Sequence, residues 1–240
     1  MIELISIIRQ MKQGVTGPFL CEANNGQKYV VKGAKATKSG LVKEWICAHL
    51  CRGFGLPIPD FQLIYVDQLL VEYGYEDLGS GICFASEYIE NIQEVTFSQQ
   101  IKMSEQLLRD LFVFDYWIKN EDRSLSPLGG NPNLFIHPKT EVIYVLDHNL
   151  SFDLNFNLDR FKQGHIGTSC WDNGQNFFDK QFYEGKFSNS IATLGIAINS
   201  LPEEWLELFD LHRIEQQITV VLEKYKYADF WEGIHREQFM

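Results

Sequence analysis

Four polar residues, widely separated along the chain, are of the types that phosphoryl transfer needs. Lys32 ends the stretch "YVVK", Asp122 lies in "NEDR", Asn133 lies in "NPNLF", and Asp147 ends "VIYVLD". A lysine ammonium can bind phosphates that do not react, and carboxylate and amide oxygens are ligands for Mg²⁺. An aspartate can also orient and deprotonate an acceptor hydroxyl. These side chains predict a phosphoryl-transfer site if the fold brings them together.

Each of these residues, taken singly, also has an ordinary structural explanation. A lysine at a strand end is commonly exposed, and the polar stretch "NEDRSLSPLGGNPNLF" (120–135) has the composition of a solvated loop. An aspartate that follows a strand commonly belongs to a turn. Lys28 shares a strand face with Lys32, because side chains alternate between faces, so alternation alone does not choose between the two lysines.

The first ninety residues have the pattern of an antiparallel sheet with one helix. Two β-rich segments, 17–23 and 27–33, flank "NNG" and predict a hairpin. A helix is predicted over 41–54, because apolar side chains recur at helical spacing and Gly55 then stops it. Further strands are predicted by apolar runs that Gly and Asp separate; these runs are 61–66, 69–74 and 82–90.

Beyond residue 90 the pattern becomes mostly helical. A long helix with a wide apolar face is predicted from Gln99 to Ile118, followed by the polar loop and the short strands "NLFI" and "VIYVLDH". Residues 155–240 are expected to be mainly helices. We therefore expect an α+β fold with two lobes, residues 1–90 and residues 91–240, and a cleft between them.

Composition restricts the class of protein and its partners. The 240 residues are 45% hydrophobic and 14% aromatic, which suits a globular protein with a sizeable core. The net charge of -11 disfavours nucleic acid and anionic lipid as partners, because such contacts depend on clustered lysine and arginine. The five cysteines form no CxxC pair, and no signal peptide or membrane span is recognisable. A cytoplasmic protein is expected.

Around the four polar residues the sequence resembles the HipA-like kinases, in particular the compact branch with "NxDR", "NPNLL" and "IDH" motifs. The motifs stand here as "NEDR" (120–123), "NPNLF" (131–135) and "LDHN" (146–149). Three further stretches agree with the branch: "YVVK", "LVKEWICAHL" and "FGLPIPDFQLI". The resemblance covers roughly residues 14 to 155. It implies one protein-kinase-like domain, with an antiparallel sheet and one main helix in the N-terminal lobe and a mostly helical C-terminal lobe.

The resemblance implies a role for each of these residues. Asp122 would be the catalytic base, while Asn133 and Asp147 would bind Mg²⁺. Lys32, the lysine that lies in the family motif, would contact the α and β phosphates of ATP. Glu44, on the helix after the strand, would pair with Lys32.

Other contacts with the nucleotide are implied less directly. Glu22 is a weaker alternative to Glu44 as the partner of the lysine. The stretch "FASEYIE" resembles the hinge of a kinase, where backbone groups of Glu87, Tyr88 and Ile89 would hydrogen-bond an adenine edge. Before the first hairpin, "KQGVTGPF" would hold the phosphate loop, in which two glycines, Gly14 and Gly17, would approach the nucleotide. No GxGxxG motif is present, and paired glycines also mark turns.

Arg123 and His148 stand beside the implied catalytic and metal-binding residues. Arg123 either pairs with an acidic neighbour, holds a phosphate, or lies exposed to solvent. His148 either orients Asp147 or satisfies nearby backbone groups.

The spacing of the implied site departs from the usual kinase pattern. Asp122 and Asn133 are 11 positions apart, whereas protein kinases place base and asparagine about five apart. The segment "SLSPLGG" therefore has the character of an insertion. It either loops out, aided by its proline and glycines, or displaces the metal ligand, and Asn131 then competes with Asn133.

The resemblance implies an ATP- and Mg²⁺-dependent kinase that phosphorylates a Ser or Thr hydroxyl of an unknown protein. Two alternatives are a small-molecule kinase and a catalytically inactive pseudokinase that serves as a nucleotide-binding interaction module. HipA-like proteins often act as toxins of toxin–antitoxin pairs, so an antitoxin-like partner is a further hypothesis.

Overall fold

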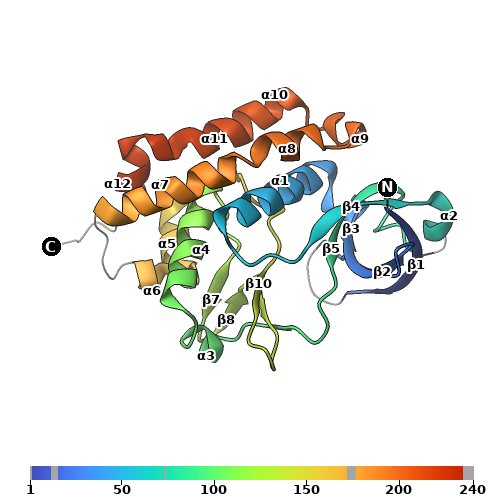
Figure 1. The fold of residues 1–240 in the computed structure, drawn as a ribbon, viewed down its shortest axis with the longest axis horizontal. Coiled ribbons are helices and arrows are strands. Elements are labelled where there is room, and N and C mark those ends of the chain that lie inside the picture. Colours follow the sequence, from blue (N-terminus) through green and yellow to red (C-terminus); the bar gives the residue numbers. More distant parts are fainter. Residues whose placement is uncertain (1, 12–15, 73, 172–176, 235–240) are drawn as a thin grey trace.

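The structure, a computed structural model, describes residues 2–11, 16–72, 74–171 and 177–234. A small β-barrel forms one end of the molecule, and helices with two small sheets form the rest (Figure 1). Within the described ranges, no helix is long and apolar enough to cross a membrane.

The predicted antiparallel sheet is in fact a closed five-stranded barrel. Its strands, in spatial order, are β1 (Ile2–Gln10), β2 (Phe19–Ala23), β3 (Lys28–Lys32), β5 (Gly81–Glu87) and β4 (Phe61–Val66). Four neighbouring pairs are antiparallel, while β1 and β4 pair in parallel and close the barrel. Closure leaves no long unpaired edge, and a separate apolar core fills the interior.

Most of the predicted elements in this region are confirmed, and one is wrong. The hairpin forms around "NNG", with Gly26 at a φ of +75°, a conformation that glycine adopts without strain. The strand predicted at 69–74 is instead a short helix, α2 (Gln68–Val71). Asp67 caps it by accepting a hydrogen bond from the Leu69 N–H at 2.8 Å, which favours a helical turn over extension of the strand.

Helix α1 (Lys38–Phe54) crosses from the barrel to the helical part and ends, as predicted, at Gly55, whose φ is +87°. Against it lie α7 (Phe177–Ile191), α8 (Leu194–Asn199) and α9 (Glu203–Leu206), which form a layer along the top of the view in Figure 1. The C-terminal helices α10 (Leu211–Ile214), α11 (Val220–Leu222) and α12 (Ala228–Ile234) complete this layer, with the π-helical turn Glu215–Thr219 and the 3-10 turn Glu223–Lys226 between them. The apolar side chains of α1 belong to the core of the helical part rather than to that of the barrel.

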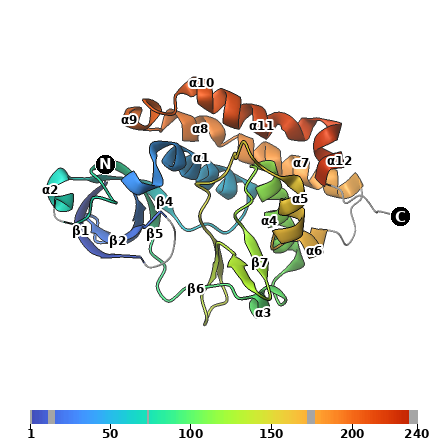
Figure 2. The same ribbon diagram turned by 180° about the vertical axis from the view of Figure 1, so that it is seen from behind.

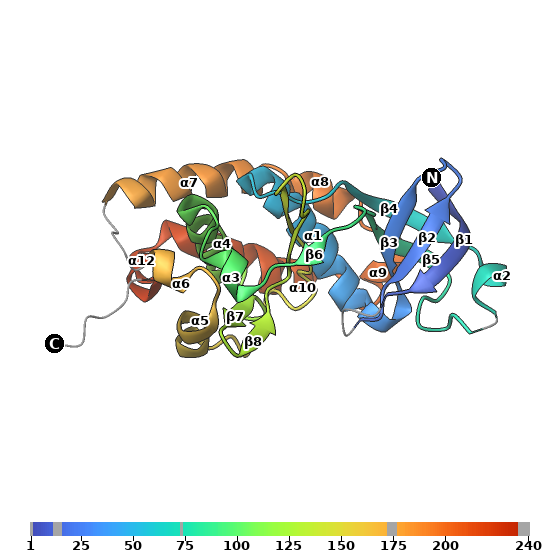
Figure 3. The ribbon, with the colours of Figure 1, turned by 90° about the horizontal axis from the view of Figure 1, so that it is seen from below.

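The predicted helix from Gln99 to Ile118 is divided in two, as α3 (Phe97–Gln100) and α4 (Glu105–Trp117). A three-stranded sheet of β6 (Gln93–Glu94), β9 (Leu134–Ile136) and β10 (Ile143–Val145) and a hairpin of β7 (Ser124–Ser126) and β8 (Gly129–Asn131) lie beside α4 (Figures 2 and 3). The chain continues through α5 (Leu158–Gly164) and α6 (Thr168–Trp171). The helical character predicted for residues 155–240 is confirmed for the described residues.

Replacing Phe54 by alanine tests the packing of α1 against the helical part. Its buried ring contacts the rings of Phe114, Trp117 and Phe187, which come from α4 and α7. We expect Phe54→Ala to lower the free energy of unfolding by about 3–5 kcal/mol, because a large cavity remains. Denaturant titration measures this loss. Leu128→Ala is the control, since Leu128 is 99% exposed and should change stability by less than about 0.5 kcal/mol.

Candidate active site

Lys32, the last residue of β3, lies at the meeting point of three segments. Its Nζ is 2.9 Å from Asp147 Oδ1 and 3.1 Å from Glu44 Oε2. Burial alone would lower the pKa of this lysine, but the two carboxylates, Asp147 first, raise it above its ordinary value. The predicted contact between Lys32 and Glu44 is present, whereas Glu22 lies opposite Lys28 in the hairpin.

The two carboxylates around Lys32 have different environments. Asp147 follows β10 in a left-handed conformation with a φ of +61°. Burial raises its pKa, but the ammonium of Lys32 outweighs that effect and holds the pKa below the usual value. Glu44 is more deeply buried, and burial raises its pKa despite Lys32. Its Oε2 also accepts the backbone N–H of His148 at 3.0 Å, which joins α1 to the segment that carries Asp147.

Asp122 and Asn133 are brought together despite the 11 positions between them. Asn133 Nδ2 donates to Asp122 Oδ2 at 3.0 Å, and Asn131 Nδ2 donates to the same oxygen at 2.9 Å. Since the amide nitrogen of Asn133 is engaged, its Oδ1 is the atom available to a cation. Asn131 and Asn133 both remain candidates for that role.

The insertion between Asp122 and Asn133 forms the β7–β8 hairpin rather than an irregular loop. Ser124 pairs with Asn131 and Ser126 with Gly129, so the chain leaves the site and returns to it. At the tip, Leu128 is almost fully exposed. The additional residues therefore project from the molecule without separating the two polar side chains.

Arg123 is fully buried, which excludes the solvent-exposed position considered from the sequence. Its Nε donates to Asp115 Oδ2 at 2.7 Å, and its Nη1 donates to the carbonyl oxygen of Asn133 at 2.6 Å. Its Nη2 lies 3.3 Å from His148 Nε2. Burial, with Arg123 adding to it, lowers the pKa of His148 to about 3, so this ring is neutral near pH 7.

Sequence reasoning missed Asp115 and His165, which complete this buried network. Asp115 accepts hydrogen bonds from Asn120 Nδ2 at 2.9 Å and contacts His165 Nε2 at 3.0 Å. Burial alone would raise its pKa, but Arg123 and then His165 hold it well below the usual value. The available signal was a carboxylate placed between aromatic residues in the stretch "FVFDYW" (112–117), since a carboxylate seldom lies in a core without a partner.

The residues predicted to contact the adenine lie at the end of β5. The Glu87 N–H donates to the Asp60 carbonyl at 2.7 Å, and the Tyr88 N–H donates to the Lys28 carbonyl at 3.0 Å. These two donors are therefore occupied by protein groups. In the part of the chain that the structure describes, the N–H of Ile89 makes no backbone hydrogen bond.

Of the two glycines predicted in the phosphate loop, Gly14 lies outside the described residues. Gly17 has a φ of +57°, and a Cβ there would lie 2.8 Å from Gln10 Nε2. A side chain at this position would meet both backbone strain and a close neighbour. The structure thus explains a glycine at position 17 by local packing.

Metal binding is limited by the number of protein ligands at this site. No group of three or more His, Cys, Asp or Glu side chains that could hold a metal ion occurs among the described residues. Asp147 and the amide oxygen of Asn133 nevertheless fit Mg²⁺, which commonly takes one or two protein ligands and completes its shell with phosphate oxygens and water.

The chain resembles known proteins in sequence pattern and in fold. The sequence model of a family described as HipA-like kinase matches residues 4–234. The proinflammatory kinase CtkA of Helicobacter pylori is similar over 91% of this chain and 94% of its own, with 13% identity and a TM-score of 0.51. The golgi casein kinase is similar over 96% of this chain and 71% of its own, with 13% identity and a TM-score of 0.39. Among curated proteins, none matches. The likeness to CtkA indicates a kinase-like fold.

Arg123→Met tests how much the buried network contributes to the free energy of unfolding. Removing the guanidinium leaves the Asp115 carboxylate buried without its cation, so the free energy of unfolding should fall by about 3–5 kcal/mol. The control is Arg52→Met, which removes an exposed pair with Asp60 and should cost less than about 1 kcal/mol. Chemical denaturation of both variants gives the comparison. Equal losses would contradict a special role for the buried pair.

Proposed function

We propose that this chain, which belongs to the HipA-like kinase family, transfers the γ-phosphate of ATP to a serine or threonine hydroxyl in a reaction that requires Mg²⁺. The observation that carries the proposal is the meeting of Lys32 with Asp147 and Glu44, at 2.9 and 3.1 Å, from three separate segments. A buried lysine between two carboxylates is costly to assemble for stability alone. Protein kinases use a strand lysine that is paired with a helix glutamate to bind phosphates, and an aspartate to bind Mg²⁺, and these residue types meet here.

In this proposal Lys32 binds the α and β phosphates, and Glu44 holds its ammonium in place. Asp147 and Asn133 Oδ1 would hold Mg²⁺, which supplies positive charge to neutralise the phosphate oxygens. The pairing of Lys32 with Asp147 keeps both side chains charged and oriented before nucleotide binds. Ile89, at the hinge, offers a backbone N–H to the adenine edge.

Asp122 would accept the proton of the acceptor hydroxyl. Two amide N–H groups, from Asn131 and Asn133, fix its Oδ2 and leave Oδ1 for the substrate. Such fixed orientation favours catalysis, because the base need not be ordered during the reaction. The alternative of an inactive pseudokinase depends on an insertion that spoils the metal geometry. The projecting hairpin, with Asn133 in contact with Asp122, supports the active kinase instead.

Asp122→Asn and Lys32→Met test the proposed roles. Asp122→Asn should reduce phosphate transfer from labelled ATP at least about a hundredfold, by loss of the base, while ATP binding and the unfolding midpoint stay close to parental values. Lys32→Met should weaken both ATP binding and turnover. Its control is Lys28→Met, an exposed lysine on the same strand, which should behave like the parental protein.

These assays would overturn the proposal if the parental protein bound no ATP. They would equally do so if turnover persisted in Asp122→Asn.

A second comparison distinguishes the two asparagines. Asn133→Ala should raise the Mg²⁺ concentration needed for half-maximal turnover, because it removes a ligand, whereas Asn131→Ala should change this concentration little. The measurement is a Mg²⁺ titration of ATP turnover for both variants. The reverse result would assign the metal to Asn131, which is exposed at the end of β8.

A further inference from the structure

The contact between Lys32 and Glu44 depends on how α1 is placed against the barrel. Lys32 lies on β3 and Glu44 lies on α1, and their charged groups are 3.1 Å apart. The core of α1 is shared with the C-terminal helices and not with the barrel interior. On the outer face of the barrel, Trp45 of α1 packs against Phe61 and Phe84 of β4 and β5. Polar contacts from the C-terminal helices add a second restraint near Lys32.

Beyond the end of β3, strand β5 has no neighbouring strand on its β3 side, while its other side continues to pair with β4. Lys32 is the last residue of β3 and lies opposite Phe84 of β5. Two positions earlier, Ile82 directs its backbone N–H and C=O to the same side as Phe84 does, because strand geometry repeats every second residue. No β3 residue is paired with Ile82.

Side chains from α9 take the place of the missing strand. Glu204 Oε1 accepts the Ile82 N–H at 2.8 Å, and Trp205 Nε1 donates to the Ile82 carbonyl at 2.9 Å. Trp205 is fully buried. Both backbone groups of this residue are thus satisfied by two consecutive residues of one short helix.

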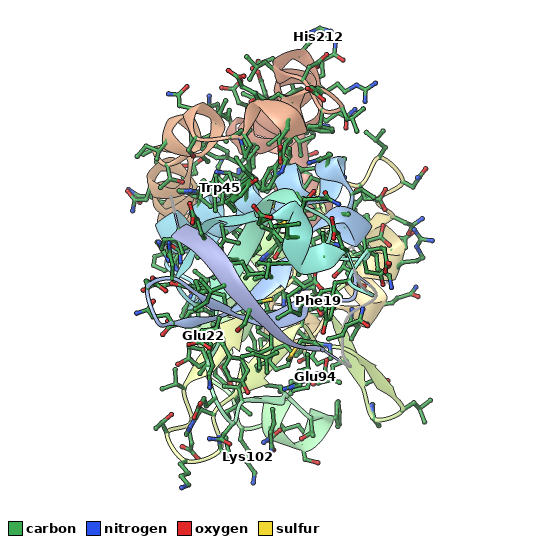
Figure 4. The ribbon with its side chains drawn as sticks, turned by 90° about the vertical axis from the view of Figure 1, so that its right-hand side faces the viewer. Phe19, Glu22, Trp45, Glu94, Lys102 and His212 are labelled. Atoms are coloured by element: carbon green, nitrogen blue, oxygen red, sulfur yellow. The ribbon has the colours of Figure 1, made fainter. Side chains whose placement is uncertain are left out.

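The same region of the C-terminal layer also makes polar contacts with α1. Glu204 Oε1 lies 3.3 Å from the Nζ of Lys38, the first residue of α1. Trp45, the residue after Glu44, donates from Nε1 to the Ala197 carbonyl at 3.0 Å and lies beneath the C-terminal helices (Figure 4). The layer therefore holds both β5, next to Lys32, and the helix that carries Glu44.

We propose that Glu204 and Trp205 are positioning residues that hold the Lys32–Glu44 pair together in the absence of nucleotide or any partner. The catalytic consequence of this positioning rests on the proposed function, while the positioning itself is a property of the fold. The chain supplies from its own C-terminal helices the restraint that keeps Glu44 facing the lysine.

The test measures the arrangement of Lys32 and the kinetics in the same set of variants. Glu204→Ala removes the acceptor for Ile82, and Trp205→Phe keeps a ring but removes its N–H donor. Acylation of Lys32 by an amine-reactive reagent, followed by mass spectrometry, reports its exposure and pairing without requiring activity. We expect faster acylation of Lys32 in both variants, because the pair opens more often.

Turnover of ATP should fall about ten- to hundredfold in both variants, mainly through kcat with a smaller change in KM, since a misoriented lysine costs more in the transition state than in binding. Glu204→Gln should have near-parental ATP turnover and Lys32 acylation, because its amide oxygen can still accept the Ile82 N–H. This variant also loses the ion pair with Lys38, but that pair is partly exposed and its loss should change both rates little.

Matched controls remove the same chemical groups elsewhere in the layer. Trp231→Phe deletes an indole N–H that donates to the Tyr225 carbonyl, and Glu207→Ala deletes an exposed carboxylate of the same helical region. Neither should change the acylation of Lys32. Glu204 is partly exposed, so Glu204→Ala should fold even if Trp205→Phe does not.

The outcomes separate the two proposals. Faster acylation in Glu204→Ala or Trp205→Phe, with parental rates in both controls, supports the positioning role. Parental acylation in Glu204→Ala and in a folded Trp205→Phe, or an equal rise in Trp231→Phe, would overturn it. If no protein of the set, parental included, turns over ATP while acylation responds as expected, the proposed function fails and the positioning role stands.

Discussion

The burial of Arg123 is the constraint on which the rest of the site depends. A guanidinium withdrawn from water must find acceptors for its N–H groups, and here it takes them from Asp115 and from the carbonyls of Pro132 and Asn133. These contacts tie the residue next to Asp122 to α4 and to the segment that carries Asn133. The position of Asn133 is consequently set by a buried cation and not by the length of the segment before it. That is why an insertion can be accommodated as a projecting hairpin while the two polar side chains stay in contact.

A second cation, Lys32, organises the other half of the site. It joins the barrel to α1 through Glu44 and to the end of β10 through Asp147. The backbone N–H of His148 also donates to Glu44, so α1 and the segment after β10 are bonded to each other as well. Buried charges of this kind are poor sources of stability, because desolvation offsets much of their attraction. Their presence is understandable if nucleotide binding replaces some of these contacts, with phosphate oxygens taking the place of a carboxylate. In our proposal the layer of C-terminal helices fixes β5 and α1, the two elements on which the Lys32–Glu44 pair depends.

Local sequence patterns predicted much of the fold, and the motif resemblance singled out Lys32, Glu44 and Asp147, which the structure brings into contact. The hairpin around "NNG", helix α1 with Gly55 at its end, and the motifs around Asp122 and Asp147 are all short-range signals.

The barrel was not predicted, because closure requires the parallel pairing of Ile2 with Ile64, which no local pattern records. The strand predicted at 69–74 was wrong, because the Asp67 side chain caps the Leu69 N–H and this favours a helical turn over the β propensity of residues 69–74. Pairing of Arg123 with an acidic neighbour was one of the alternatives considered from the sequence, and Asp115 is that neighbour. His165 was missed for the same reason as closure, since it lies 50 positions from Asp115.

A crystal structure of the protein with a non-hydrolysable ATP analogue and Mg²⁺ would locate the phosphates and the metal directly. We expect Lys32 Nζ to lie within hydrogen-bond distance of a nonreacting phosphate oxygen, with Mg²⁺ bound by Asp147 and by Oδ1 of Asn133. We also expect Asp122 to face the γ-phosphate. An analogue bound with its phosphates away from Lys32 and Asp147 would show that these residues do not form the nucleotide site.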